Sequence, residues 1–395
     1  MPAHLVAEDT LHDAVGEYAA LLDHFSGSSN LFADKFSTFI TEETEEDVEY
    51  SPEVFTYVSG ETAETLAQTI PDKDLESVVN LVVFILLQQE SSKFETSVQE
   101  WFTNLITAQQ FGDKVEKNKK KTLKVLSLIS NLSAVYNLDV SATLKQWLLT
   151  QIVHLVRILD DVKILKPFVT NAENIIDSNS ASEETRSLLV EAAQLYSTVD
   201  AQESLKLLQL AATKISPASP ELIEKLIIKS LNTSTALDLT HLTSDSTITS
   251  SAPSALVTLL EQYHSLPTSE FAPLLASTSI SSLDTTTVLS KNKTLTLLTL
   301  AQSTPVLTYS EISKALDIPE TQVELVLIDA IKRGAIEGKI NQIKSEFHVF
   351  GVKLIVKKIE LQDWKDIKEK LLVQKKALGE IRSLVENVQK KNKKN

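Results

Sequence analysis

The sequence predicts a protein dominated by α-helices: a right-handed solenoid of irregular helical repeats, then a winged helix-turn-helix with a small β-hairpin, then one long C-terminal helix. Three observations support this fold class. Apolar residues recur at helical spacing from residue 61 to 232, the period becomes that of strands after Gly334, and a heptad pattern follows residue 361. Only 8 Gly and 11 Pro occur in 395 residues, which favours long helices with short connections. We expect four regions, 1–60, 61–290, 291–360 and 361–395.

The first region is expected to hold two amphipathic helices, over about 11–22 and 31–39, followed by an acidic loop at 41–49. Residues 1–100 contain 21 Asp and Glu against 3 Lys and Arg, although the net charge of the whole chain is only −15. The last 45 residues have the opposite balance, 13 basic against 6 acidic. We interpret 41–49 as a solvated connection, with partner binding as the alternative.

Between 61 and 232 the sequence predicts one helix after another, with breaks at Pro71, Gly112 and Pro167 among others. Each helix pair can bury its apolar stripe only against the next pair, so a right-handed solenoid is expected. No strict repeat is present, which indicates the degenerate tetratricopeptide or HEAT kind. The expected helices span 61–70, 72–90, 93–109, 113–136, 141–158, 182–198, 200–214 and 219–232.

Two stretches rich in Ser and Thr follow, at 230–254 and 277–290, and 13 of the 25 residues in the first are Ser or Thr. Neither can bury much apolar surface by itself, so both are interpreted as connections between short helices such as 253–263 and 268–275. Regulatory phosphorylation of these stretches is an alternative role.

A capping box marks the winged helix-turn-helix: the Thr308 hydroxyl can accept from a free backbone N–H while Glu311 reaches back to the cap. A short helix is expected from Glu311 to Leu316. Pro319 then stands near the first position of a third helix, and Gly334 can cap its end. One face of that third helix is apolar, formed by Val323, Val326, Leu327, Ala330 and Ile331.

After Gly334, two β-rich runs flank the polar turn Lys344-Ser345, which predicts a hairpin. The third helix carries Glu320, Glu324 and Asp329, and its cations stand only in the last turn. Such a helix would repel phosphates, so DNA recognition through it is disfavoured.

The final helix is expected from about Leu361 to Val388, with one polar interruption, Gln374, in a heptad seam. We identify no intrachain partner for this seam and expect it to pack against helices of other subunits; folding back on the wing is the alternative. The outer strand of the wing is expected to pair with a neighbour's sheet edge. The predicted partner-binding residues are therefore Phe347, Val349, Phe350, Val352, Trp364, Ile367, Leu371, Gln374, Leu378, Ile381, Val385 and Val388.

An acidic winged helix after a long helical region resembles the PCI domain, a family that builds scaffolds of the proteasome lid, the COP9 signalosome and translation initiation factor 3. The resemblance covers about 200–360, and Asn341 stands where this family usually has Asp. The tail 361–367, with Gln362 and Trp364, looks like the start of the final helix in one PCI subunit of translation initiation factor 3. The resembling runs are 297–301, 309–312, 323–331 and 334–342.

The resemblance implies a non-catalytic, cytoplasmic scaffold subunit of translation initiation factor 3 that supports assembly on the 40S ribosomal subunit. The implied partners are sibling PCI and MPN subunits and the 40S subunit, directly or through siblings, with no membrane, DNA or cofactor. A subunit of the COP9 signalosome or the proteasome lid is the first alternative. A winged-helix regulator that binds nucleic acid is the second.

The sequence offers no pattern for catalysis or metal binding. Cysteine is absent, and the seven histidines form no H-E-x-x-H or H-x-H pattern. No G-x-S-x-G occurs, and the Lys-rich run after Gly112 lacks the second glycine of a phosphate loop. We therefore expect no enzyme and no metal or cofactor site. We also expect no signal peptide, since the residues after Met1 lack a basic start and an apolar core.

Overall fold

The computed structural model describes residues 10–43, 48–71, 73–109, 119–178, 182–277, 280, 282–353 and 361–392. The chain forms two compact units, residues 1–226 and 227–395, and the boundary lies inside the helix α13 (Pro220–Asn232). The predicted class, helices throughout with a small antiparallel sheet near the C-terminus, is confirmed. The helices of 227–290 belong to the same unit as the winged helix.

The first unit begins with two helices, α1 (Leu11–Ser26) and α2 (Leu31–Ser37), as expected. Asp23 joins them, because its carboxylate accepts from the backbone N–H groups of Phe32 and Ala33 at the start of α2. The prediction of a plain acidic loop at 41–49 is wrong. An antiparallel pair, β1 (Ile40–Glu43) and β2 (Val48–Tyr50), occupies its ends, while 44–47 lie outside the described residues.

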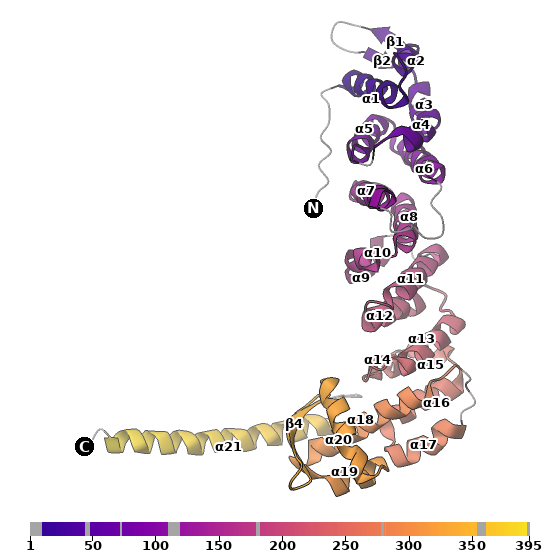
Figure 1. Cartoon of the computed structure of the whole chain (residues 1–395). Helices are drawn as coiled ribbons and strands as arrows, with labels where there is room; N and C mark the ends of the chain where they lie inside the picture. The colour runs from indigo at the N-terminus through magenta and orange to yellow at the C-terminus, as the bar shows by residue number, and fades with distance from the viewer. Residues whose placement is uncertain are drawn as a thin grey trace. The chain divides into compact units, whose positions relative to one another are not determined.

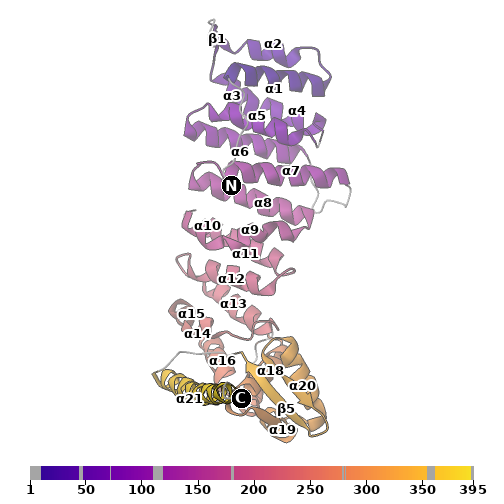
Figure 2. The ribbon, with the colours of Figure 1, turned by 90° about the vertical axis from the view of Figure 1, so that its left-hand side faces the viewer.

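Helices then follow one another as stacked layers, which Figures 1 and 2 show in indigo to pink. Neighbours in the chain pack together, α7 on α8 and α11 on α12. The aromatic side chains of Tyr18, Trp101 and Phe102 are fully buried among them. The helices are α3 (Glu53–Ser59), α4 (Glu61–Thr69), α5 (Leu75–Leu87), α6 (Ser91–Ala108), α7 (Lys119–Tyr136), α8 (Ala142–Leu159), α9 (Lys166–Thr170), α10 (Ala172–Ser178), α11 (Glu183–Tyr196) and α12 (Ala201–Thr213).

The predicted break at Pro167 is wrong. Pro167 lies in the first turn of α9, where its missing N–H leaves no hydrogen bond unmade. A short 3-10 helix, Val162–Leu165, leads directly into α9, so the segment between α8 and α11 is helical along most of its length.

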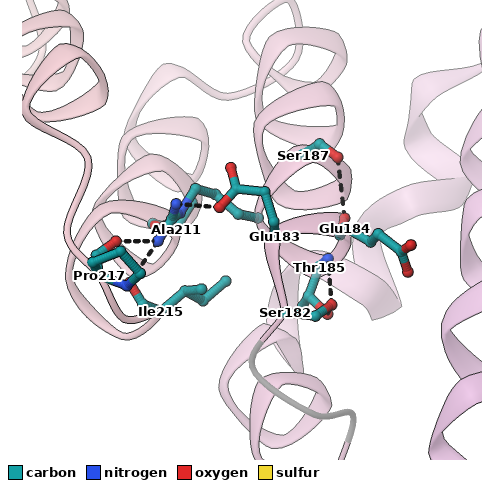
Figure 3. A network of polar contacts seen from close by, with 9 residues as sticks. Ser182, Glu183, Glu184, Thr185, Ser187, Ala211, Ile215 and Pro217 are labelled. Carbon is teal, nitrogen blue, oxygen red and sulfur yellow. Dashed lines mark hydrogen bonds and ion pairs between the residues drawn. The ribbon is translucent and has the colours of Figure 1, made fainter.

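A buried arginine holds the end of α12, and Figure 3 labels its partners Glu183, Ala211, Ile215 and Pro217. Arg186 on α11 is only 6% exposed, and its guanidinium donates to the carbonyl oxygens of Ala211 (3.3 Å), Ile215 (2.7 Å) and Pro217. It also forms an ion pair with Glu183 one turn earlier. One side chain thereby satisfies a carbonyl in the last turn of α12 and two carbonyls in the segment that follows it.

In the second unit, the Ser- and Thr-rich stretches are more helical than predicted. The first contains α14 (Thr240–Ser244) and α15 (Ser246–Ser251). The second ends in α18 (Thr285–Ser303), where the Asp284 carboxylate accepts from the N–H groups of Thr286 and Thr287. The two helices between them, α16 (Ser254–Ser265) and α17 (Thr268–Ser277), lie where expected.

Two buried polar residues anchor α18 to its neighbours. Lys291 is completely buried, and its Nζ donates to the carbonyl oxygens of Ser230 (2.8 Å) and Leu231 (3.0 Å) at the end of α13. The Asn292 amide donates to the carbonyl oxygens of Tyr263 and Leu266 at the end of α16. Thus α18 caps the C-terminal ends of two helices at once.

The winged helix has the predicted helices, with α19 (Tyr309–Leu316) and α20 (Glu320–Lys332) following α18. Its sheet has three strands rather than two: β3 (Val306–Thr308), β4 (Ile336–Asn341) and β5 (Glu346–Val352). Their order is β3-β5-β4, all antiparallel, with β5 packed on α18 and β4 on α20. A last helix, α21 (Leu361–Asn392), ends the chain.

Candidate interaction surface

The capping box at the start of α19 is confirmed. The Thr308 hydroxyl accepts from the Glu311 N–H (3.3 Å), and the Glu311 carboxylate accepts from the Thr308 N–H (2.9 Å). These bonds to the charged form lower the pKa of Glu311. Gly334 closes α20 as predicted: it has φ of +65°, and the following N–H of Ala335 bonds back to the Ala330 carbonyl.

Helix α20 presents apolar side chains on two sides. Val323, Leu327 and Ala330 are buried against the rest of the winged helix. On the opposite side, Leu325 is 67% exposed and Ile328 is 40% exposed. The second side has no cover among the described residues, so it belongs to a surface where another chain could bind.

The wing strand β5 is not the outer strand that the sequence suggested. It lies between β3 and β4, so edge pairing through Glu346 to His348 is excluded, because β3 already occupies that side. Phe347 is completely buried and is a core residue rather than a contact for a partner. Val349 and Val352 are half-buried, whereas Phe350 is exposed.

A hollow of about 750 Å³ lies between α20 and the wing. Hydrogen bonds hold the polar side chains of its wall in place: the Glu324 carboxylate accepts from the Tyr309 hydroxyl (3.0 Å) and from the Gln342 amide (2.9 Å). Burial and the neighbouring Glu324 carboxylate raise the pKa of Tyr309 to about 12. The hollow is lined by Glu324, Ile328, Lys339, Ile340, Asn341, Gln342, Ile343, His348 and Phe350.

The rim of this hollow is apolar. Ile343 is 99% exposed and Phe350 is 66% exposed, and Lys339 Nζ lies 5.8 Å from the centroid of the Phe350 ring. Large exposed apolar side chains around a hollow are typical of surfaces that bind another protein. The partner-binding residues predicted from the sequence include Phe350 but not Leu325, Ile328 or Ile343, although the exposed side of α20 repeats at helical spacing.

The seam of α21 is exposed along its described length. The side chain of Val388 lies outside the described residues, while the other seam residues are all solvent-accessible. Leu372, Val373 and Leu384 add exposed apolar side chains beside the seam. The exposed seam residues are Trp364, Ile367, Leu371, Gln374, Leu378, Ile381 and Val385.

Around Leu371 the apolar surface extends beyond one stripe. Leu371, Leu372 and Val373 are consecutive and each more than half exposed, and successive helical residues point about 100° apart. This turn is therefore apolar on more than one side, which suits a helix surrounded by several others. Among the described residues, α21 carries nine large apolar side chains that are exposed to solvent.

The described residues hold no group of three or more His, Asp or Glu side chains placed to bind a metal ion. Within the same residues, no helix is both long and apolar enough to cross a membrane. A mainly apolar cavity of about 470 Å³ between α7, α8 and α9 of the first unit is lined by side chains such as Ile129, Leu149 and Phe168.

Comparison with known proteins matches residues 283–350, from the cap of α18 to β5, to the PCI domain. Subunit M of eukaryotic translation initiation factor 3 from Coccidioides immitis is 25% identical over 343 residues, which cover 81% of this chain and 71% of that protein. Subunit M from Yarrowia lipolytica is 38% identical over 77 residues, 20% of this chain and 19% of the relative. Subunit M from Emericella nidulans is 31% identical over 85 residues, 20% and 17% of the two chains. The chain therefore carries a PCI domain and resembles the M subunits of translation initiation factor 3.

Proposed function

We propose that this chain is a non-catalytic scaffold subunit of eukaryotic translation initiation factor 3, in the cytoplasm. It would join sibling PCI and MPN subunits and support assembly on the 40S ribosomal subunit. The observation that carries the proposal is the exposed apolar seam of α21, which ends a chain similar to subunit M over most of its length. An uncovered seam of this length is stabilised only when another helix packs on it.

Two surfaces would serve this function. The seam of α21 would pack against helices of sibling subunits. The hollow between α20 and the wing, with its rim of Ile328, Ile343 and Phe350, would take apolar side chains from a neighbour. This second contact replaces the pairing along an outer strand, because β5 is central in the sheet.

The test is affinity purification of the full chain in which Leu371, Leu378 and Ile381 are all changed to Asp. Burial of each such side chain contributes about 1.5–3 kcal/mol, so the triple change is expected to weaken association by more than about a thousandfold. Mass spectrometry of the purified material should then find sibling subunits with the unchanged chain and not with the variant.

The matched control changes Lys376 and Ser383 to Asp. These positions lie on the outer side of the same helix, and the double change alters the net charge by the same amount as the triple change. The control should retain all partners and should sediment with 40S particles. Recovery of the same partners with the seam variant would count against the proposal. Recovery of COP9 or proteasome-lid subunits instead would assign the chain to another assembly.

A further inference from the structure

Among the side chains that the structure describes, one flank of the α21 seam carries only cations. Lys368, Lys375 and Arg382 stand seven residues apart, each directly after a seam position, and all three are exposed. These are e positions of the heptad, the positions that contact the flank of a partner helix. On the other flank the described residues are Ala377 and Leu384, so neither described flank offers a carboxylate.

The nearby carboxylate of Glu386 does not neutralise this row. Arg382 Nε lies 2.9 Å from Glu386 Oε1, but the two side chains are 83% and 51% exposed. Such an exposed pair contributes little and is readily exchanged for another partner. Lys368 and Lys375 form no ion pair among the contacts of the described residues. The row is thus available to an incoming anionic group.

A second copy of this chain is a poor occupant of the seam. In an antiparallel pair the e positions face each other, which would place the cationic rows of the two copies together. In a parallel pair Arg382 would face Ala377 of the other copy, which has no charge to offer. Like charges at these positions oppose association, so the seam is built for a different sequence.

We propose that the α21 seam takes a helix from another chain whose flanking residues, facing Lys368, Lys375 and Arg382, are Asp or Glu. This rests on the proposed function and adds the chemistry of the partner to it. The cationic row runs parallel to the apolar seam along the same helix. A nucleic acid would use the row and leave the seam uncovered, whereas an acidic amphipathic helix satisfies both.

The test uses the full chain and two designed helical peptides of about four heptads, long enough for a stable seam. Both peptides have the same Leu and Ile seam; one has Glu at its flanking positions and the other has Lys. Fluorescence anisotropy in about 0.1 M NaCl should show binding of the Glu peptide about 30-fold tighter than that of the Lys peptide. In about 1 M NaCl the Debye length is only about 3 Å, so charge attraction between the helices is largely screened and this ratio of affinities should fall to a few-fold.

Reversal of the row provides the decisive comparison. The variant Lys368→Glu, Lys375→Glu, Arg382→Glu should prefer the Lys peptide. The control Lys365→Glu, Lys376→Glu, with charges reversed away from the flank, should keep the preference for the Glu peptide. Equal affinities for the two peptides, no binding of the Glu peptide, or an unchanged preference in the reversed variant would each overturn the inference.

A nucleic-acid ligand is tested in the same assay with a single-stranded RNA oligonucleotide. RNA binding that is tighter than peptide binding and is unchanged by Leu371→Asp would also overturn the inference. The proposed function is tested separately in cell extract. If the row variant keeps its sibling subunits while the seam variant loses them, the scaffold function stands and the acidic partner helix is refuted. If the seam variant keeps them, the scaffold function itself fails.

Discussion

Lys291 is predicted to make the second unit more stable as the pH rises above neutrality. Burial, and to a lesser extent the nearby Arg333 guanidinium, lower the pKa of Lys291 from 10.5 to about 7. Between these two values the unfolded chain binds a proton that the folded chain has released. Stability therefore increases with pH in this window, which is the opposite of the effect expected from a lysine held in an ion pair.

The geometry explains why the neutral amine suits this place. A neutral amine has two N–H groups, and Nζ has two acceptors, the carbonyls of Ser230 and Leu231 at 2.8 and 3.0 Å. The Tyr263 ring centroid lies 5.5 Å from Nζ, so one side of the group faces an aromatic surface. The slope should reach at most about 1.4 kcal/mol per pH unit, the value for one proton.

The variant Lys291→Met tests this reasoning. Loss of Nζ leaves two buried carbonyls without donors, which destabilises by about 1–3 kcal/mol for each near pH 9. Near pH 7 the unchanged chain must release the proton of Lys291 to fold, whereas the Met variant has no proton to release. The difference in the free energy of unfolding between the two chains should therefore be smaller near pH 7 than near pH 9, by about 1–3 kcal/mol.

Hydrogen exchange in the full chain measures the local stability around Lys291, through peptides from α13 and α18. The exchange rates are corrected for the intrinsic pH dependence of exchange. Lys293→Met on the same helix, at a partly exposed position, is the control and should keep the pH dependence of the unchanged chain. If the difference in the opening free energy of these peptides between the Lys291→Met chain and the unchanged chain stays constant from pH 7 to 9, a charge-dependent role of Lys291 is refuted.

Three further changes follow from single contacts. Gly338→Ala should destabilise the winged helix by about 1–3 kcal/mol in urea unfolding, because a Cβ there would lie 2.4 Å from both the His348 backbone oxygen and the Phe347 ring. Gly16→Ala is the control: a Cβ at that position meets no neighbour, so the change should be tolerated. Arg186→Met should lower the free energy of unfolding of the first unit by about 2–4 kcal/mol, as three carbonyls lose a charged donor. The hydrogen bonds from Thr286 and Thr287 lower the pKa of Asp284 to about 2. The contribution of Asp284 to the stability of the fold is therefore fully present above about pH 4 and is lost as the pH falls through about 2. Asp284→Asn should remove this pH dependence from the acid unfolding curve.

Features set by nearby residues could be predicted from the sequence. The capping box joins Thr308 to a residue three positions on, and Gly334 follows the end of a clear apolar stripe, so neither depends on tertiary contacts. The start of α18 had a local signal that was missed. Asp284 precedes three threonines, an N-cap pattern that outweighs the composition of the segment as a whole.

Features set by distant residues could not be predicted in this way. β3 has three residues, too few to show a period, and exists because β5 pairs with it from about 40 residues further along the chain. Lys291 and Asn292 are ordinary polar residues in sequence, and only the meeting of α18 with the ends of α13 and α16 buries them. The exposure of the α21 seam likewise depends on where the rest of the chain packs.

The order of the sheet decides how the wing can meet a partner. With β5 in the middle, the edge strands are β3, which has only three residues, and β4, which carries Lys339. The bulge in the pairing of β4 with β5 has its extra residue, Phe350, on β5. A very short edge strand and a lysine on an edge strand are both features that oppose pairing with another strand. A Cβ at Gly338 would lie 2.4 Å from the His348 backbone oxygen on β5, so a larger residue there would distort the wing. Contacts through side chains at Ile343 and Phe350 are therefore favoured over a shared sheet, and this leaves the α21 seam as the longest surface from which a partner can gain apolar burial.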